Sequence, residues 1–183
     1  MYSPQLVVSV ANGVLDKWLH TTPDGIPRVA AIQPMNAQNM LYGRYEIRAR
    51  MDFIEGFKVA WLLWPQSGKK LPDGEIDFPE RNLDSPYVWG FVHRQGATVH
   101  EDQAWFRITA DATQWHTYVT EWTPNLVVFY IDGVEVGRTT ERIPNTPMHW
   151  VIQTETRLYI GPPPPEVEGH IQIDWVKIWA WGT

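Results

Sequence analysis

The run Gly74-Glu75-Ile76-Asp77-Phe78-Pro79-Glu80 places three carboxylates within six residues of one another. Side chains alternate between the two faces of a β-strand, so Glu75 and Asp77 are expected to share a face. Simple alternation would turn Glu80 to the opposite face. One extra residue, a β-bulge, would bring Glu80 back, and Pro79 suits a bulge because proline cannot donate to the ladder. The run therefore predicts a bulged strand with three acids on one side.

A pair of carboxylates on one strand face could supply the two closely spaced carboxyl groups that a retaining glycosidase requires. At about 3.3 Å per residue, the Cα atoms of Glu75 and Glu80 would lie roughly 13 Å apart. Two long side chains that lean together could then reach the carboxyl gap of about 5–5.5 Å that retention needs. The alternative is an exposed strand whose acids only face water, and the spacing alone leaves both interpretations open.

The composition is that of a globular domain. The 183 residues are enough for one domain with its own core, and no linker or repeat divides them, so residues 1–183 are expected to form a single domain. The chain contains 11 tryptophans, well above ordinary usage. Indole offers a flat, weakly hydrated face on which the C–H groups of a sugar can stack. The tryptophan surplus is consistent with carbohydrate binding as well as with a large core.

Charge and hydropathy argue against several partners. The net charge is −6 and the basic residues are scattered, which predicts no nucleic-acid partner. No apolar stretch is long enough to span a bilayer, so no membrane partner is expected. The absence of cysteine excludes disulfides and thiolate chemistry. The histidines that show no metal-ligand spacing are His20, His100, His149 and His170.

Short runs of strand-forming residues separated by turns fill the chain, and no convincing helix is present. The dipeptides Asn12-Gly13 and Asp132-Gly133 each join two such runs and predict tight hairpins. A dozen strands at this spacing predict an all-β fold, an antiparallel β-sandwich or jelly roll in which one sheet can present a concave face. The other predicted strands span residues 28–33, 43–53, 57–64, 75–78, 87–93, 105–108, 115–122, 150–156 and 170–181.

The acid run and its neighbours resemble glycoside hydrolase family 16. The stretch 75–80 is similar to the E-[IL]-D-x-x-E signature of that family, in the bulged form of its laminarinase-like members. Collinear segments that also resemble the family are Tyr42-Gly43-Arg44-Tyr45-Glu46-Ile47-Arg48, Ala60-Trp61-Leu62-Leu63, Trp115-His116-Thr117-Tyr118, Glu121-Trp122-Thr123-Pro124, Tyr130-Ile131-Asp132-Gly133 and Ile173-Asp174-Trp175-Val176. The resemblance extends from about residue 5 to the end of the chain.

The resemblance implies a concanavalin-like jelly roll with a concave substrate cleft. It also implies a retaining, endo-acting hydrolase of a β-linked polysaccharide, with β-1,3-glucan of the laminarin type as the first expectation. By correspondence with the family motif, Glu75 is expected to be the nucleophile and Glu80 the general acid/base, with Asp77 between them. The alternative is a non-catalytic carbohydrate-binding or structural protein of the same fold, such as part of a phage tail or surface assembly.

The resemblance and the strand pattern together suggest further side chains in contact with the polysaccharide. For each of them a structural role is the competing interpretation: a paired strand face, a structural histidine, an internal tryptophan. The candidates are Glu46, Arg48, Trp64, His93, Trp105, Gln153 and Glu155.

The resemblance also bears on cofactors, on assembly and on location. No cofactor is expected to be required, although some members hold a structural Ca²⁺ through an aspartate that corresponds to Asp174. Family members usually have one or more strands before the point at which this chain begins, so the domain is expected to lack them, and an oligomer or larger assembly could cover the open edge. Leu71-Pro72 stands where bulged members often have Trp-Pro. An extracellular or secreted location is expected, with a virion-associated one as the alternative.

Overall fold

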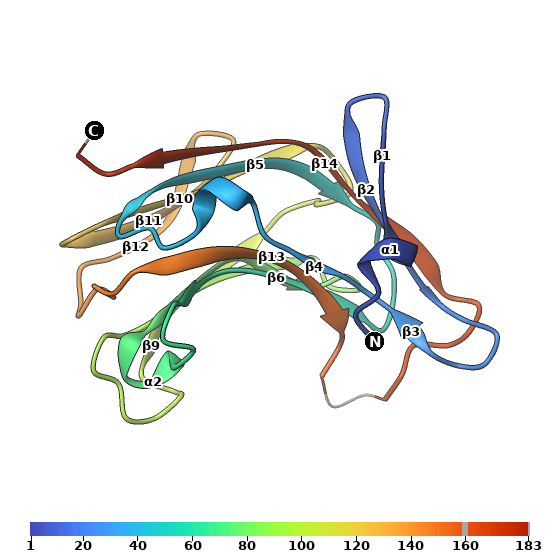
Figure 1. The fold of residues 1–183 in the computed structure, drawn as a ribbon, viewed down its shortest axis with the longest axis horizontal. Coiled ribbons are helices and arrows are strands. Elements are labelled where there is room, and N and C mark those ends of the chain that lie inside the picture. The colour runs from blue at the N-terminus through green and yellow to red at the C-terminus, as the bar shows by residue number, and fades with distance from the viewer. Residues whose placement is uncertain (159–160, 183) are drawn as a thin grey trace.

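The computed structural model describes residues 1–158 and 161–182, and in this part of the chain two antiparallel β-sheets pack face to face (Figure 1). The outer sheet has the strand order β1-β2-β14-β5-β10-β11-β12, with β3 paired to β2. Its strands are β1 (Val8–Ala11), β2 (Val14–Thr21), β3 (Pro27–Arg28), β5 (Gly43–Met51), β10 (His116–Thr123), β11 (Leu126–Ile131), β12 (Val134–Thr139) and β14 (Glu168–Ala180).

The second sheet, here called the cleft sheet, has the strand order β4-β13-β6-β7-β8-β9. In Figure 1 its strands β13 and β6 arch, with the hollow side turned away from the outer sheet. The predicted antiparallel sandwich is therefore confirmed. The strands of the cleft sheet are β4 (Ala31–Ile32), β6 (Phe57–Pro65), β7 (Glu75–Asn82), β8 (Tyr87–His93), β9 (Gln103–Thr109) and β13 (Met148–Thr156).

Strand alternation builds the core between the two sheets. Along β5, Tyr45, Ile47 and Ala49 are almost fully buried, whereas the intervening charged side chains are partly exposed. The rings of Trp61 and Trp122, one from each sheet, lie in the same core cluster. Burial of such large apolar surfaces is the main favourable term in folding, and it fixes which face of each strand turns outward.

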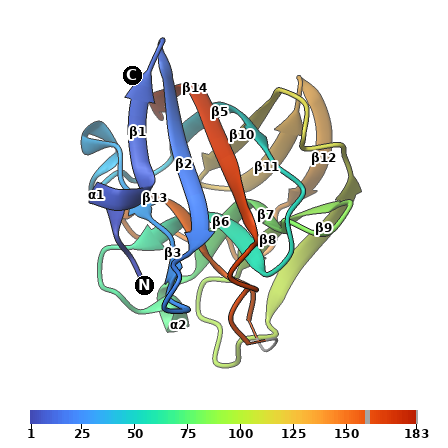
Figure 2. The ribbon, with the colours of Figure 1, turned by 90° about the vertical axis from the view of Figure 1, so that its right-hand side faces the viewer.

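Both hairpin predictions are confirmed. In the first, Asn12 and Gly13 have φ values of 53° and 79°, and Ala11 pairs with Val14 across the turn. The Asp132-Gly133 turn between β11 and β12 has φ values of 51° and 79°. Two consecutive left-handed residues define the turn that best matches strand twist, which explains the Asn-Gly and Asp-Gly sequences. The β1–β2 hairpin projects beyond the body of the sandwich (Figure 2).

The structure corrects two details of the sequence prediction. Short helices are present at α1 (Pro4–Val7) and α2 (Lys70–Asp73), and a 3₁₀ turn, η1, spans Met35–Ala37. The single strand predicted over 28–33 is two short strands, because β3 pairs with β2 in the outer sheet and β4 pairs with β13 in the cleft sheet. No helix among the described residues is long and apolar enough to cross a membrane.

Gly90 of β8 is expected to be intolerant of a side chain. A Cβ atom at this position would lie 2.7 Å from the ring of Phe129, which itself stacks on Phe78 with a centroid distance of 4.6 Å. Gly90→Val should therefore lower the free energy of unfolding by about 1–3 kcal/mol through overpacking. Urea unfolding measures the change. Ala11→Val on the exposed edge strand β1 is the control and should stay within about 0.5 kcal/mol of the unsubstituted protein.

Candidate active site

A β-bulge in β7 brings the three carboxylates to one face. In the ladder with β8, Asp77 pairs with Phe91 and Glu80 pairs with Trp89, so an advance of three residues along β7 matches two residues along β8. The ladder with β6 shows the same shift, since the partners of Asp77 and Glu80 are Leu62 and Ala60. One extra residue therefore lies between Asp77 and Glu80, and the predicted bulge is confirmed.

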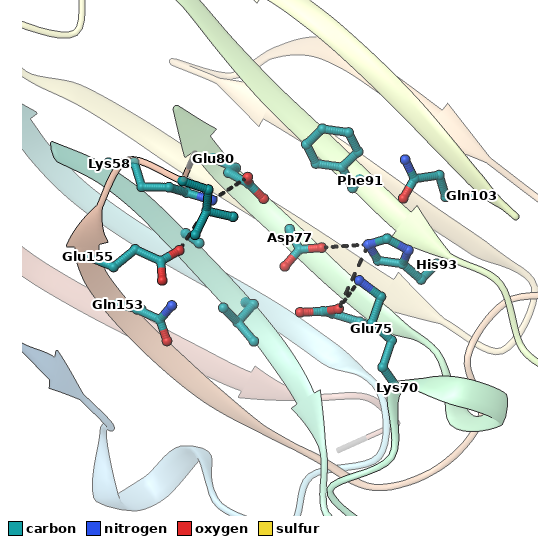
Figure 3. Close-up of a pocket in the computed structure, with 13 residues that line it drawn as sticks. Lys58, Lys70, Glu75, Asp77, Glu80, Phe91, His93, Gln103, Gln153 and Glu155 are labelled. Atoms are coloured by element: carbon teal, nitrogen blue, oxygen red, sulfur yellow. Dashed lines mark hydrogen bonds and ion pairs between the residues drawn. The ribbon is translucent and has the colours of Figure 1, made fainter. Parts of the chain in front are cut away.

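The carboxylates line a hollow of about 330 Å³ on the concave face of the cleft sheet (Figure 3). Most of the lining side chains come from five neighbouring strands, β13, β6, β7, β8 and β9, so the hollow crosses the sheet instead of following one strand. Six of the predicted site residues meet here: Glu75, Asp77, Glu80, His93, Gln153 and Glu155. The others that line the hollow are Lys58, Ala60, Leu62, Lys70, Phe91, Gln103 and Leu158.

Burial and crowding favour the protonated forms of Glu75 and Asp77. Burial raises the pKa of Glu75 to about 8, and the neighbouring Asp77 carboxylate acts in the same direction. The pKa of Asp77 is raised as well, first by burial and then by Glu80. Lys70 opposes this effect, because its Nζ lies 3.0 Å from Oε2 of Glu75 and favours the ionised form. Two like charges this close cannot easily ionise together, so the pair shares a proton near neutrality.

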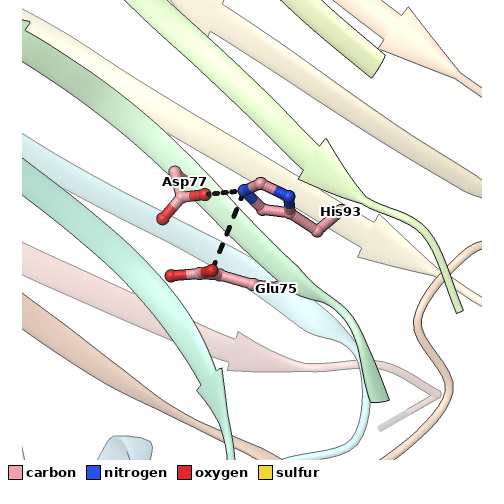
Figure 4. Close-up of side chains that lie close together, drawn as sticks. All are labelled: Glu75, Asp77 and His93. Carbon is pink, nitrogen blue, oxygen red and sulfur yellow. Dashed lines mark ion pairs between the residues drawn. The ribbon is translucent and has the colours of Figure 1, made fainter. Parts of the chain in front are cut away.

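His93 faces these two acids from β8 (Figure 4). Its Nε2 lies 3.5 Å from Oδ2 of Asp77 and 3.8 Å from Oε2 of Glu75. Burial lowers the pKa of His93, and the positive charge of Lys70 lowers it further. The ring is therefore neutral at neutral pH, and it offers hydrogen-bonding capacity to the acids instead of a full charge.

Lys58 of β6 ties the third acid to the far side of the hollow. Its ammonium donates to Oε1 of Glu80 at 2.9 Å and lies 3.2 Å from Oε1 of Glu155. Burial acts to lower the pKa of Lys58, but the two carboxylates outweigh burial and hold it above its ordinary value. A permanently charged, nearly buried ammonium thus fixes the position of the Glu80 carboxylate.

The two predicted stacking tryptophans lie on the cleft sheet but outside this hollow. Trp64 is partly buried and packs against Ala60, Leu62 and Val151 on the concave side. Trp105, on the edge strand β9, is 59% exposed and pairs with Phe91. Both rings are near the hollow and neither lines it, so their contact with substrate stays a prediction.

The prediction that Glu46 and Arg48 line the cleft is wrong. Both belong to β5 of the outer sheet and alternate with buried residues, so they point away from the cleft sheet. Arg44 donates to Oε1 of Glu46 at 2.6 Å, and Arg48 pairs with Asp174 of β14. Alternation showed correctly that Glu46 and Arg48 share a face, but it could not show which sheet β5 joins.

The surroundings of Asp174 do not fit a calcium site. Its carboxylate is already engaged by the Arg48 guanidinium. Among the described residues, the acidic and histidine side chains close enough to share a metal are Glu75, Asp77 and His93, on the other sheet. Calcium takes about 6–8 oxygen ligands, and among the described residues Asp174 belongs to no group of three or more acidic or histidine side chains.

Sequence reasoning missed several lining residues. Lys58 and Phe91 could have been found from strand parity, because Lys58 is two residues from Ala60 and Phe91 is two residues from His93. Lys70 had no such signal, since it reaches the hollow from the short helix α2 that precedes β7.

Comparison with known proteins agrees with this geometry. The family model described as glycosyl hydrolases family 16 matches residues 29–177. A β-glucanase of Bacillus subtilis is 30% identical over 112 residues, which cover 61% of this chain and 46% of that protein. An endo-1,3-1,4-β-glycanase of Rhizobium meliloti is 29% identical over 150 residues, which cover 76% of this chain and 30% of that protein. The chain spans from 16% to 46% of the length of the first three curated relatives.

Solved structures share the fold. The β-glucanase of Bacillus licheniformis superposes with a TM-score of 0.79 at 20% identity, covering 97% of this chain and 84% of that chain. The laminarinase catalytic domain of Thermotoga maritima gives a TM-score of 0.78 at 19% identity, and the superposition covers 100% of this chain and 83% of that chain. The jelly-roll arrangement of the two sheets is therefore that of these enzymes.

Removal of calcium is expected to leave the protein unchanged. Because Arg48 neutralises Asp174, excess EDTA should not alter Tm, whereas Arg48→Met should lower stability by up to about 1 kcal/mol. Thermal unfolding with and without EDTA measures both effects. A fall of several degrees that calcium alone reverses would contradict this account.

Glu75→Gln is expected to stabilise the protein at alkaline pH. The folded-state pKa of about 8 lies above the ordinary 4.5, so the native state holds more protons than the unfolded state between these values. Stability of the unsubstituted protein must then fall as pH rises through this window. The amide removes that loss and should add roughly 1–3 kcal/mol at about pH 8, with little gain at about pH 4.

Urea unfolding at the two pH values measures the difference. Glu55→Gln, an exposed carboxylate outside the hollow, is the control and should have little effect at either pH. An equal gain from Glu75→Gln at both pH values would show that burial of its charge is not the cause.

Proposed function

Since the chain belongs to glycosyl hydrolase family 16, we propose that it is a retaining, endo-acting hydrolase of a β-linked glucan. The leading candidate for its substrate is β-1,3-glucan. One observation supports this above others: a bulged strand presents Glu75, Asp77 and Glu80 along one open hollow. Two carboxyl groups that flank the scissile bond are the machinery of glycoside hydrolysis.

The proposed reaction divides the work between the two glutamates. Glu75 attacks the anomeric carbon and forms a glycosyl ester, while Glu80 gives its proton to the departing glycosidic oxygen. Glu80 then takes a proton from water, whose oxygen attacks the same carbon and releases Glu75. The net result is one bond hydrolysed with retained configuration, and both carboxyl groups return to their starting states.

Asp77 and its neighbours prepare Glu75 for attack. The nucleophile must lose its proton, although burial raises the pKa of Glu75. Lys70 stabilises the charge that Glu75 must carry, and Asp77 can hold the proton that Glu75 gives up. Unequal environments for adjacent carboxyls are the usual basis for such a division of roles.

The lining of the hollow favours a neutral polymer. Four acids, Glu75, Asp77, Glu80 and Glu155, face two lysines, and His93 is neutral. Even with a proton shared by Glu75 and Asp77, the hollow has no surplus of cations to pair with sulfated or uronic polysaccharides, so glucan is favoured over carrageenan-type galactans. Relatives are named both laminarinase and 1,3-1,4-β-glycanase, and we place β-1,3-glucan first with mixed-linkage glucan as the second candidate.

Reducing ends released from laminarin and from mixed-linkage β-glucan test the proposal. Glu75→Gln is expected to lower kcat on the preferred polymer by at least about 10³-fold, because it removes the nucleophile. Carrageenan and agarose serve as the anionic and galactan comparisons. Binding of laminarin without release of reducing ends would favour the non-catalytic carbohydrate-binding alternative.

Glu80→Gln separates the acid role from the nucleophile role. On laminarin its kcat/KM should fall by about 10³-fold or more, because the leaving sugar needs a proton. On β-laminaribiosyl fluoride, which loses fluoride without protonation, kcat/KM should stay within about tenfold of the unsubstituted value. Equal losses on both substrates would contradict the assignment of Glu80 as the acid.

A further inference from the structure

Tryptophan also gathers on the outer sheet, which the proposed reaction does not use. Four tryptophans are exposed among the described residues, and three of them belong to β2, to β14 or to the residue after β14: Trp18, Trp179 and Trp181. The fourth, Trp105, belongs to the cleft sheet. An exposed indole leaves a large apolar surface in contact with water, so a group of them on one surface suggests a binding site.

Strand register places Trp179 on the outward face of the outer sheet. Trp179 pairs with Arg44 across the β14–β5 ladder, and Glu121 pairs with Arg44 from β10. Tyr45, the neighbour of Arg44, is buried in the core, so Arg44 and its two cross-strand partners point away from the cleft sheet. In Figure 1 this end of β14, next to the C-terminus, lies above β6 and β13. It is therefore on the opposite side of the sandwich from the main hollow, which holds the three carboxylates.

A hollow of about 330 Å³ lies at this end of the outer sheet. Trp179 and Trp181 contribute aromatic surface to it, and Arg44, Glu121 and Thr123 contribute polar groups. Ligand pockets have volumes of about 300–1,000 Å³ and combine apolar surface with a few polar groups, so this hollow has room for about one or two sugar rings. We propose that it is a second, non-catalytic binding site for the β-glucan chain, here called the outer site. The inference rests on the proposed glucanase function and adds a site to it.

The polar groups of the outer site are held in place and still reach solvent. The Nε atom of Arg44 donates to Oε1 of Glu46 at 2.6 Å, and its guanidinium also pairs with Glu121. The Tyr130 hydroxyl donates to Oε2 of Glu121 at 3.1 Å. The side chains of Arg44 and Glu121 nevertheless remain 39% and 33% exposed. Groups that are fixed before binding lose little conformational entropy when they bond to sugar hydroxyls.

The charges around the outer site favour a neutral ligand. Arg44 and Glu121 balance each other, and the next pair along the β14–β5 ladder, Lys177 with Glu46, does the same. This arrangement leaves no net charge to attract an anionic polymer. Charged residues are depleted from the cores of protein interfaces, and a stable interface buries roughly 800 Å² on each partner. Two indoles supply at most about 300–500 Å², so a glucan chain fits this surface better than a protein does.

A site on this face would hold the domain on its polymer without taking part in the reaction. A second point of attachment raises the effective concentration of the cleft next to a long or insoluble chain. A short oligosaccharide cannot reach from one side of the sandwich to the other, so it gains nothing from the outer site. The expected effect is therefore on binding to bulk glucan and not on cleavage of short substrates.

Binding to curdlan, an insoluble β-1,3-glucan, tests the inference. The Glu75→Gln protein is the starting point, because loss of the proposed nucleophile leaves the polymer intact during the measurement. Adding Trp179→Ala should weaken the Kd, measured by depletion of protein from the supernatant, by about fivefold or more. Trp179→Phe keeps a flat ring and should stay within about twofold of the starting protein.

Two controls separate the outer site from a general effect of the substitution. Trp18→Ala removes another exposed tryptophan of the outer sheet, which pairs with His170 at the other end of β14, and should leave curdlan binding within about twofold. Trp179→Ala alone, with Glu75 intact, should keep its kcat/KM on laminaripentaose within about twofold, which shows that the fold and the cleft are unchanged.

Three results would overturn the inference. Unchanged curdlan binding by Trp179→Ala, or equal losses from Trp179→Ala and Trp18→Ala, would remove the outer site while leaving the glucanase proposal intact. Self-association of the unsubstituted protein that Trp179→Ala abolishes, measured by sedimentation, would assign this surface to a second copy of the chain. An unsubstituted protein that neither cleaves laminarin nor binds curdlan would overturn the glucanase proposal and the outer site together.

Discussion

The architecture of this domain depends on one constraint: three carboxylates must share a face of β7 while the opposite face of the same strand closes the core. Glu75, Asp77 and Glu80 point into the hollow, and Ile76 and Phe78 are buried among apolar residues on the other side. The bulge makes both demands compatible, because it inserts one residue without reversing the strand. Neighbouring carboxylates lower the stability of the fold, but their different environments allow one to act as an acid and another as a base.

The two sheets have different roles. Every residue that lines the main hollow lies on a strand of the cleft sheet or in a segment next to one, while the outer sheet supplies the surface against which that sheet packs. Contacts such as Phe78 on Phe129 join the two at the level of the carboxylates. Lys58 and Lys70 then hold the outer two acids from either side. Rigid strands and charged clamps together keep the three carboxylates in place.

Local sequence was enough for the features that depend on local geometry. The Asn12-Gly13 turn and the bulge at residues 78–79 follow from backbone preferences, and the structure has both. Features that depend on pairing between distant strands were not accessible. Glu46 and Arg48 were assigned to the cleft because alternation fixes a face but not a sheet. Lys70 was missed because a short helix outside the strand pattern delivers it.

The central claim is that Glu75 forms a covalent bond to the sugar during the reaction. In 2-deoxy-2-fluoro-β-laminaribiosyl fluoride, the 2-fluoro group disfavours positive charge at the anomeric carbon and should slow both formation and hydrolysis of the glycosyl ester. Incubation of the protein with this compound should therefore trap the ester. Mass spectrometry of a proteolytic digest should then find one added disaccharide on the peptide that contains Glu75. An adduct on a different carboxylate, or active protein that never forms one and releases product with inverted configuration, would contradict the account.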